Sequence, residues 1–391
     1  MIPKVYTEKL LRCKIDELST MSVGCFNKNF QCELAQATTE LQKEIIIRKE
    51  LKNLIDLYEK TNFLYPEKKE RILDYMTLIL DNWYLALTKG DEILSIIKFI
   101  GNNKNHEQLT TISFWRTTNN SWIAQHLCST GFSLGVCAMM LKSQAEVNFE
   151  RYRYRSFQNW FSKSNHFANS VFGTLVKTIG KQYSSVKLFQ YIGFETISLL
   201  QSYNIRIVPY DHHMQEELFN FYCKIRGKQD AEAEEFDTSD IELDQLDQVY
   251  QSVNLRRRRF IWMAYKKNKT HPIGVAVANR GPFGFNMSLI ENRCDLLIDP
   301  ALSFEDRKTI CHNLLVAASS AYFETNLIDY PISYIPVVTD KKSADILLMS
   351  GATFLREYNK SVWLRGGYEK WYNHIQEKYT SFFETMKNKY R

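Results

Sequence analysis

The sequence lacks the short motifs that would assign a chemistry at once. Its 391 residues contain no P-loop, no glycine-rich dinucleotide fingerprint, no serine-hydrolase elbow and no cyclic-dinucleotide receptor pattern. The eight cysteines include no Cys-x-x-Cys pair, and some, such as Cys137 and Cys311, sit inside apolar runs. We therefore expect small buried thiols in a reducing compartment.

Signals for export and for membrane insertion are missing as well. No charged-then-apolar region opens the chain, and no apolar run approaches the roughly 18 residues that would span a bilayer. His212 and His213 beside Asp211 lack a spaced third ligand, so no metal site is expected. The expectation is a cytoplasmic protein without a membrane span.

What the sequence does contain fits a globular protein with a full core. Hydrophobic residues make up 45%, and the 24 Phe and 22 Tyr suit sheets and apolar pockets. The net charge of +6 permits an anionic ligand without demanding a nucleic acid. The length predicts an N-terminal extension (1–38) and two domains, 39–200 and 201–391, the second with a C-terminal helix.

Local patterns predict the order of elements in each half. In the first half, Thr39 and Gln42 form a capping box for a helix up to about residue 60. The strands and helices expected after it are strands 83–88, 93–100, 109–116 and 121–127, a helix at 134–149 and a strand at 151–161. The second half should hold strand 205–209, helix 214–225, hairpin 260–265 and 273–279, strand 294–298 and a helix capped by Ser303.

Two charged segments of the second half have ordinary explanations. The acidic stretch 230–247 is expected to be a solvated loop or helix face. Arg256–Arg259 is expected to be a solvated strand end, although a nucleic-acid patch remains an alternative.

A weak unit appears twice in this order: a strand, a capped loop, a helix rich in small residues, a second strand and a closing apolar-Gly element. The first copy starts at 122–127 and closes on 188–194, and the second starts at 294–300 and closes on 346–352. A constant offset aligns Ser185 with Ser343 and Gly193 with Gly351. In α/β proteins, a strand that leads into a helix N-terminus is where phosphate-bearing ligands bind.

This order resembles the GNAT acyltransferase superfamily, as a tandem and partly degenerate member. In that family two central strands splay apart, and N–H groups at the next helix start hold the pyrophosphate of acyl-coenzyme A (acyl-CoA). The segment 189–195 looks like the family's closing Tyr-x-x-x-Gly-Phe element, with Tyr191 closer to Gly193 than usual. The resemblance implies an α+β (layered α/β) fold of two GNAT-like domains, each a mixed, mainly antiparallel sheet flanked by helices.

The resemblance also suggests site residues in the first copy. Ser129, Thr130, Gly131 and Gly135 are the expected cofactor-binding residues, although they miss the family's Gln/Arg-x-x-Gly-x-Gly/Ala spacing. His126 could act as a base near an acyl thioester, with a hydrogen-bonded core histidine as the alternative. Tyr191 is the expected acid for the leaving thiolate.

The corresponding turn of the second copy has no glycine. Its two carboxylates, Glu305 and Asp306, would repel a pyrophosphate, so this copy is expected to be structural or to bind the acceptor.

The resulting hypothesis is an N-acyltransferase-like protein that transfers an acyl group from an acyl-CoA-type donor to an amine on a small molecule or a protein. One alternative is a catalytically inactive GNAT-like module for binding or regulation. Another is a Fem-like aminoacyl transferase, which Arg256–Arg259 would support through charged tRNA. A nucleic-acid partner is left open but not favoured.

Overall fold

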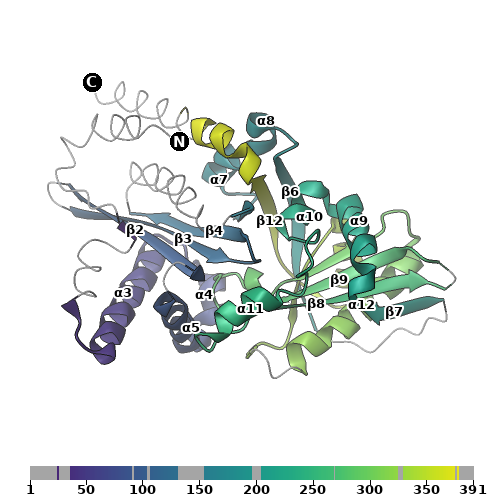
Figure 1. Ribbon diagram of the computed structural model, residues 1–391, viewed down its shortest axis with the longest axis horizontal. Coiled ribbons are helices and arrows are strands. Elements are labelled where there is room, and N and C mark those ends of the chain that lie inside the picture. Colours follow the sequence, from purple (N-terminus) through teal and green to yellow (C-terminus); the bar gives the residue numbers. More distant parts are fainter. Residues whose placement is uncertain are drawn as a thin grey trace.

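A computed structural model describes residues 24–25, 36–89, 92–103, 106–130, 154–195, 204–267, 269–324, 329–374 and 377. Over these residues the backbone forms one 12-stranded mixed sheet flanked by helices (Figure 1). The strand order is β1-β2-β3-β4-β5-β12-β6-β11-β10-β9-β8-β7. The predicted α+β class, with a mixed and mainly antiparallel sheet, is confirmed.

The elements follow one another in a similar order in the two halves. The strands of the first half are β1 (Gly24–Cys25), β2 (Leu94–Asn103), β3 (His106–Arg116), β4 (Ser121–Ser129), β5 (Ser156–Ser162) and β6 (Ser184–Phe194). Its helices are α3 (Glu40–Lys60), α4 (Pro66–Ile72), α5 (Met76–Thr88), α7 (His166–Val171) and α8 (Leu175–Ile179).

The second half begins after residue 203. Its strands are β7 (Ile205–Pro209), β8 (Arg258–Lys266), β9 (Pro272–Arg280), β10 (Cys294–Ile298), β11 (Ile335–Thr339) and β12 (Thr353–Leu364). Its helices are α9 (Gln215–Arg226), α10 (Lys228–Ala233), α11 (Asp244–Gln251), α12 (Phe304–Phe323) and α13 (Lys341–Met349).

The sheet has the same pairing pattern from either end. β2, β3 and β4 are antiparallel neighbours and β4 is parallel to β5; in the same way β8, β9 and β10 are antiparallel and β10 is parallel to β11. At the centre, β12 is antiparallel to β5, β6 is antiparallel to β11, and β6 and β12 pair with each other. The last strand of each half therefore completes the sheet of the other half.

This exchange joins the two halves into one continuous sheet, where the sequence had suggested a sheet in each domain. β6 precedes residue 200, yet its ladder partners β11 and β12 both belong to the second half. The two-domain division at residue 200 stays a prediction, and its boundary falls in 196–203, outside the described residues. Backbone hydrogen bonds across β5, β12, β6 and β11 hold the halves together.

Several predicted elements are present as expected. Thr39 and Gln42 form the capping box of α3, and Ser303 accepts a hydrogen bond from the Asp306 backbone N–H at the start of α12. The predicted hairpin of the second half is the β8–β9 pair. The predicted helix at 134–149 lies outside the described residues.

Residues 83–88 were expected to form a strand, and that prediction is wrong. They are the end of α5, which buries Ile79, Trp83 and Ala86 on one face. That spacing is helical, but the short apolar run around Trp83 matches a buried strand equally well when it is considered alone.

The predicted match of the two closing elements is also wrong. Gly351 follows α13, but Gly193 lies inside β6, where Ile192 and Phe194 are buried. The structural counterpart of Gly351 is Gly180, which follows α8; the two glycines have φ values of 96° and 92°. Glycine adopts this left-handed region readily at the end of a helix.

Charged side chains are buried at the centre of the sheet, contrary to the expected solvated acidic stretch. Glu234, just after α10, is almost completely buried and accepts hydrogen bonds from Arg259 (3.0 Å), Arg293 (2.7 Å) and Lys360 (2.9 Å). Burial alone would raise the pKa of Glu234, but Arg293, Lys360 and Arg259 outweigh it and hold the pKa well below its usual range. Glu234 thus connects β8 and the residue before β10 to the exchanged strand β12.

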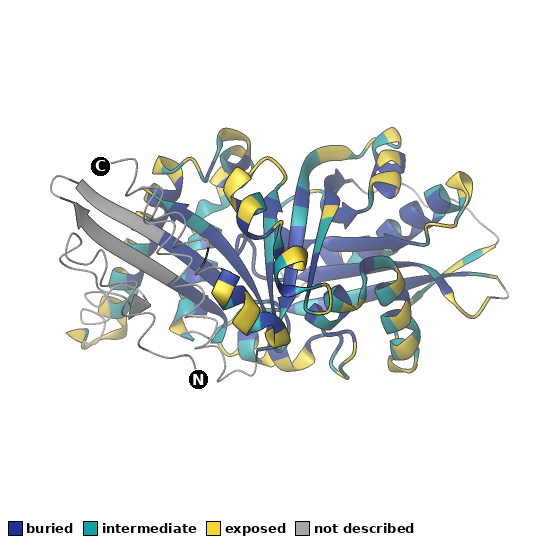
Figure 2. Ribbon diagram, turned by 90° about the horizontal axis from the view of Figure 1, so that it is seen from above, coloured by how far each residue is buried: buried dark blue, intermediate teal, exposed yellow. Residues whose placement is uncertain are grey.

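The remaining acidic side chains of this stretch include further buried ones. Asp230, Glu235 and Asp247 are each at least 98% buried. Figure 2 shows that buried residues follow the strands through the middle of the molecule, while exposed residues lie on the surrounding helices and loops. The stretch was expected to be solvated because the Arg and Lys side chains that neutralise it lie far away in the sequence.

Candidate functional site

The parallel strands β4 and β5 separate soon after they meet. They pair only at Ser121–Ser156, Trp122–Phe157 and Ile123–Gln158, although β4 continues to Ser129 and β5 to Ser162. Beyond these positions the two strands diverge and leave an opening in the sheet.

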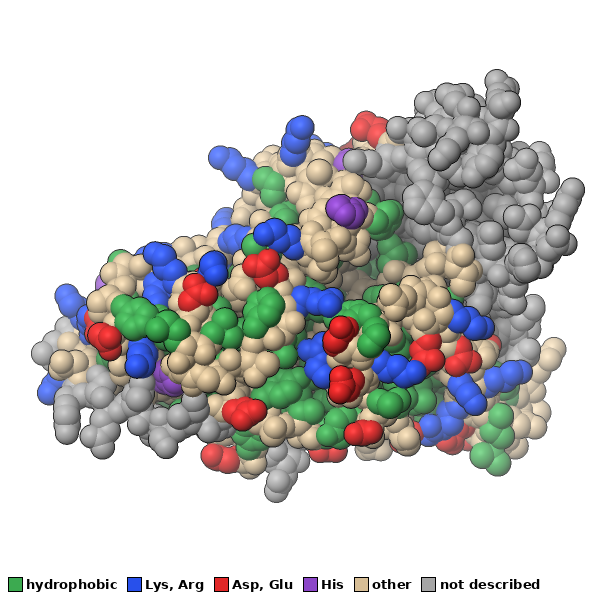
Figure 3. All heavy atoms as spheres, turned by 180° about the vertical axis from the view of Figure 1, so that it is seen from behind, with side chains coloured by type: hydrophobic (Ala, Val, Ile, Leu, Met, Phe, Trp, Pro, Cys, Tyr) green, Lys and Arg blue, Asp and Glu red, His purple; other side chains and the backbone are tan. Residues whose placement is uncertain are grey.

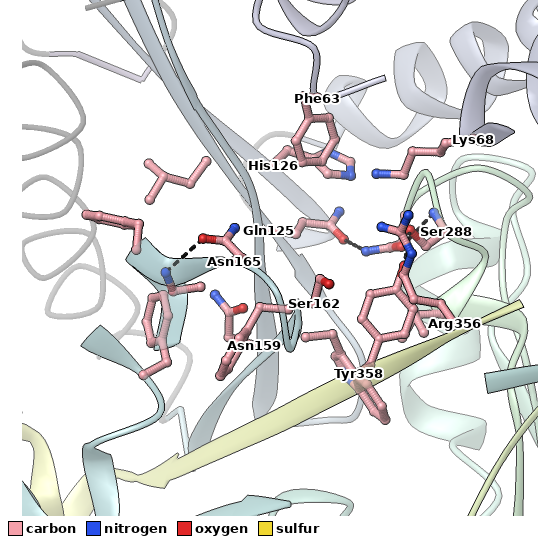
Figure 4. A pocket seen from close by; sticks show the side chains of 18 of the residues that line it. Phe63, Lys68, Gln125, His126, Asn159, Ser162, Asn165, Ser288, Arg356 and Tyr358 are labelled. Atoms are coloured by element: carbon pink, nitrogen blue, oxygen red, sulfur yellow. Dashed lines mark hydrogen bonds between the residues drawn. The ribbon is translucent and has the colours of Figure 1, made fainter. Parts of the chain in front are cut away.

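A cavity of about 280 Å³ lies at this opening (Figure 4). Its walls come from β4, β5, β12, the segment 62–68 and the loop 286–290 of the second half. The polar groups in this lining include Gln125, His126, Asn159, Ser288 and Tyr358. Both halves of the chain therefore contribute to it.

His126 lies in a bulge of β4. The β3–β4 register shifts between Thr111 and Ser113, His126 has no ladder partner on β3, and its φ is 54°. Its ring stacks on Trp83 with centroids 5.5 Å apart and planes 10° apart. A bulge re-aims a side chain and frees backbone groups from the ladder, and here it turns His126 toward the cavity.

The imidazole of His126 is neutral, and a hydrogen bond to one ring nitrogen fixes its tautomer. Nε2 accepts a hydrogen bond from the Met287 backbone N–H at 3.4 Å, whereas Nδ1 has no partner within the described part of the chain. Burial, and secondarily Lys68, lowers the pKa of His126 well below its usual value. In this tautomer Nδ1 carries the ring hydrogen, so Nε2 is the nitrogen that can accept a proton.

Lys68 and Arg356 bring positive charge to the cavity. Lys68 on α4 is 5% exposed, and its ammonium lies 3.9 Å from the centre of the Phe63 ring. Arg356 on β12 is half-buried, and its guanidinium lies 4.1 Å from the centre of the Tyr65 ring. Burial, with a smaller contribution from Arg356 and Arg71 nearby, lowers the pKa of Lys68 to about 7.

The loop after β9 is fixed against β4 by buried hydrogen bonds. Gln125 donates from Nε2 to the Phe285 carbonyl (2.7 Å) and accepts from Asn286 Nδ2 at its own Oε1 (2.5 Å). The Glu291 carboxyl accepts from the backbone N–H groups of Gly284 (2.7 Å) and Asn286 (3.2 Å), and burial raises its pKa to about 8. This loop supplies Ser288 to the cavity.

Tyr191 and Tyr358 differ in their access to the cavity. Tyr191, on β6, is not among the lining residues; its buried hydroxyl donates to the Ser288 carbonyl at 2.6 Å, and burial raises its pKa well above the usual value. Tyr358, on β12, lines the cavity and donates to Ser288 Oγ at 3.0 Å. Sequence reasoning missed Tyr358 because only the strand exchange brings β12 beside β5.

The expected phosphate-binding segment is described only in part. Ser129 ends β4 at the diverging side and Thr130 follows it, exposed. Gly131 and Gly135 lie outside the described residues. Their role in cofactor binding stays a prediction.

Side chains cross the corresponding opening in the second half. β10 and β11 pair at Cys294–Val337 and Asp295–Val338, and Thr339 Oγ1 then donates to the Leu296 carbonyl at 2.9 Å. Arg307, buried in α12, donates to Ser343 Oγ and to the Asp299 carbonyl, both at 3.0 Å. These hydrogen bonds connect β11 to β10 and α12 to α13, so Thr339 and Arg307 have a structural role here.

The Arg256–Arg259 cluster is not a solvated basic patch. Arg257 and Arg259 are completely buried, with Arg257 donating to the Thr117 carbonyl at 3.0 Å. Arg256 pairs with Asp247 at 2.7 Å and Arg258 lies 3.4 Å from Asp244. On the described part of the face in Figure 3, basic and acidic side chains alternate. The cluster therefore gives no support to the Fem-like alternative.

Among the residues with described positions there is no group of three or more His, Cys, Asp or Glu side chains arranged to hold a metal ion. Likewise, none of their helices has both the length and the apolar character needed to cross a bilayer.

No family model matches the chain, and no curated protein is significantly similar to it. Among solved structures, it is similar to a tandem GNAT protein from the clavulanic acid biosynthesis pathway (6% identity, 73% of this chain and 87% of that one, TM-score 0.37). It is also similar to a GCN5-related N-acetyltransferase from Sphaerobacter thermophilus (8%, 68% and 80%, 0.34). A third is a GNAT-family acetyltransferase from Colwellia psychrerythraea (9%, 69% and 85%, 0.31). At such identities and TM-scores these similarities assign no activity to this chain.

Proposed function

We propose that this chain is an N-acyltransferase-like protein whose first half binds an acyl-CoA-type donor between β4 and β5. The observation that carries the proposal is the divergence of these strands around a cavity lined by the neutral imidazole of His126. The GNAT resemblance implies the donor at such an opening, since family members hold acyl-CoA between two splayed central strands.

The size of the cavity suits the reacting end of the donor rather than all of it. At about 280 Å³ it is near the lower end of the roughly 300–1,000 Å³ of small-molecule sites. In this proposal the thioester and the amine meet inside the cavity. The pyrophosphate lies outside, at Ser129, Thr130, Gly131 and Gly135, where a helix N-terminus would favour its charge.

The proposed reaction forms a C–N bond and breaks the C–S bond of the thioester. The neutral His126 ring accepts the proton that the attacking amine loses, and the leaving thiolate takes a proton from a tyrosine. Tyr191 was the acid expected from the sequence, and Tyr358 has direct access to the cavity. Holding the amine against the carbonyl supplies much of the rate, and backbone N–H groups at the β4 bulge would polarise that carbonyl.

Calorimetric titration with acetyl-, malonyl- and long-chain CoA tests the donor. Gly131→Asp adds a side chain and a negative charge where the phosphates would approach. Losing charge-assisted hydrogen bonds of this kind costs about 1.5–3 kcal/mol, so affinity should fall at least tenfold. Phe304→Asp is the matched control in the second half, beside Glu305 and Asp306, and should leave affinity unchanged. Equal affinity in both variants would place the donor elsewhere, and no binding of any CoA would refute the proposal.

A further inference from the structure

Two cations line the cavity without an acidic partner among the described residues. The Lys68 ammonium is close to aromatic faces, 3.9 Å from the Phe63 ring centre and 5.5 Å from that of Tyr65. Arg356 approaches the same Tyr65 ring at 4.1 Å. Neither side chain forms an ion pair or hydrogen bond with another described residue, and no described Asp or Glu lines the cavity.

An isolated ammonium at this depth has to be explained. Lys68 is 95% buried, and burying a charge without a counter-charge is strongly unfavourable. Lys360, a buried lysine on β12, instead has two acidic partners, Asp230 and Glu234. Lys360 on β12 is thus neutralised, whereas Lys68 on α4 faces the cavity with no acidic partner among the described residues.

The surrounding groups favour an anion of small size. The ring nitrogens, amides and hydroxyls of His126, Gln125, Asn159 and Ser288 are uncharged. Figure 4 shows Lys68 and Arg356 on the same side of the cavity as Ser288, with Lys68 extending toward His126. An anionic group placed there would neutralise both cations and remain next to the proposed base.

We propose that Lys68 and Arg356 bind a carboxylate of the substrate, so that the enzyme acts on a carboxylate-bearing reactant. This inference rests on the proposed acyl transfer and specifies its substrate class. The carboxylate has two sources, the acyl group of a dicarboxylic donor such as succinyl-CoA, or an amino-acid acceptor. In either case Lys68 and Arg356 orient the reactant and do not exchange its proton.

The first experiment measures the anion site without any CoA. Succinate is titrated into the wild-type protein, followed by NMR, and compared with the uncharged succinamide. Succinate should bind at least tenfold more tightly, and Lys68→Met and Arg356→Gln should each remove most of that difference. Lys69→Met is the matched control from the same helix, because Lys69 lies at the surface and pairs with Glu59, and it should retain the difference.

The second experiment identifies the source of the carboxylate. The donor arm compares succinyl-CoA with acetyl-CoA, and the acceptor arm compares β-alanine with ethylamine. A preference of at least tenfold for the carboxylate in one arm, lost in Lys68→Met and kept in Lys69→Met, assigns the source.

The outcomes separate this inference from the proposed function. If acetyl-CoA binds but succinate, succinyl-CoA and β-alanine show no preference, the carboxylate site is refuted and acyl transfer stands. If no CoA binds but succinate binds in a Lys68-dependent way, acyl transfer is refuted and the anion site stands. A preference that persists in both Lys68→Met and Arg356→Gln would overturn the inference as well.

Discussion

Replacing Glu234 by Gln should destabilise the whole sheet. The carboxylate of Glu234 accepts from Arg259 on β8, from Arg293 just before β10, and from Lys360 on β12. Each of these four side chains is at most 4% exposed. Glutamine keeps the shape of the side chain but removes the charge, so the cations outnumber the carboxylates that remain.

The expected magnitude follows from the cost of leaving a buried charge unpaired. Removing one partner of a buried ion pair costs about 3–5 kcal/mol. With an unfolding entropy of about 2.1 cal/mol/K per residue, the melting temperature should fall by about 4–6 °C. Glu232→Gln is the control; Glu232 lies 3.6 Å from the exposed Lys228, so its loss should cost less than about 1 kcal/mol.

The pH dependence gives a second test of the same reasoning. The folded-state pKa of Glu234 is depressed, so its contribution is complete above the unfolded value of about 4.3 and is lost as pH falls below it. The difference between Glu234→Gln and wild type in thermal melts should therefore be constant from pH 8 to 6 and smaller at pH 3.5. Adding Lys360→Met should recover part of the loss, because that change reduces the excess of buried cations over carboxylates. A melting temperature within 1 °C of wild type at pH 7 would refute this account of the network.

Two further predictions concern the cavity. His126→Asn suits the left-handed backbone at this position and should lower kcat by about 10²–10⁴-fold in steady-state acyl-transfer assays, whereas the control His213→Asn should leave kcat unchanged. Because the pKa of His126 is lowered, the pH profile of the wild-type rate should show no titration near pH 6.5. Normal turnover by His126→Asn would exclude His126 as the base. The folded-state pKa of Lys68 is about 7, against about 10.4 in the unfolded chain, so the cost of burying its charge is largest below pH 7 and diminishes between pH 7 and about 10.4. Lys68→Met should therefore be more stable than wild type at pH 6 and similar to it at pH 10.5. Equal denaturation midpoints of the two proteins at pH 6 would contradict a buried ammonium without a counter-charge.

The sequence determined the local elements because their signals lie within a few residues of one another. The Thr39–Gln42 capping box, the Ser303 cap and the β8–β9 hairpin are examples. The sequence also indicated where β4 passes the candidate site, with His126 on it. Short apolar runs did not distinguish a helix from a strand, because the end of α5 contains the same residue types as a buried strand.

The tertiary structure alone decided how distant segments meet. β12 inserts beside β5, which brings Tyr358 and Arg356 to a cavity formed mainly by the first half. Glu234 and Lys360 lie far apart in the chain, so the acidic stretch gave no local sign of burial. Lys68 resembles any surface lysine of a short helix until Phe63 and Tyr65 cover it. Strand exchange and the neutralisation of buried charge are non-local, because the free energy of each group depends on partners that only the folded chain supplies.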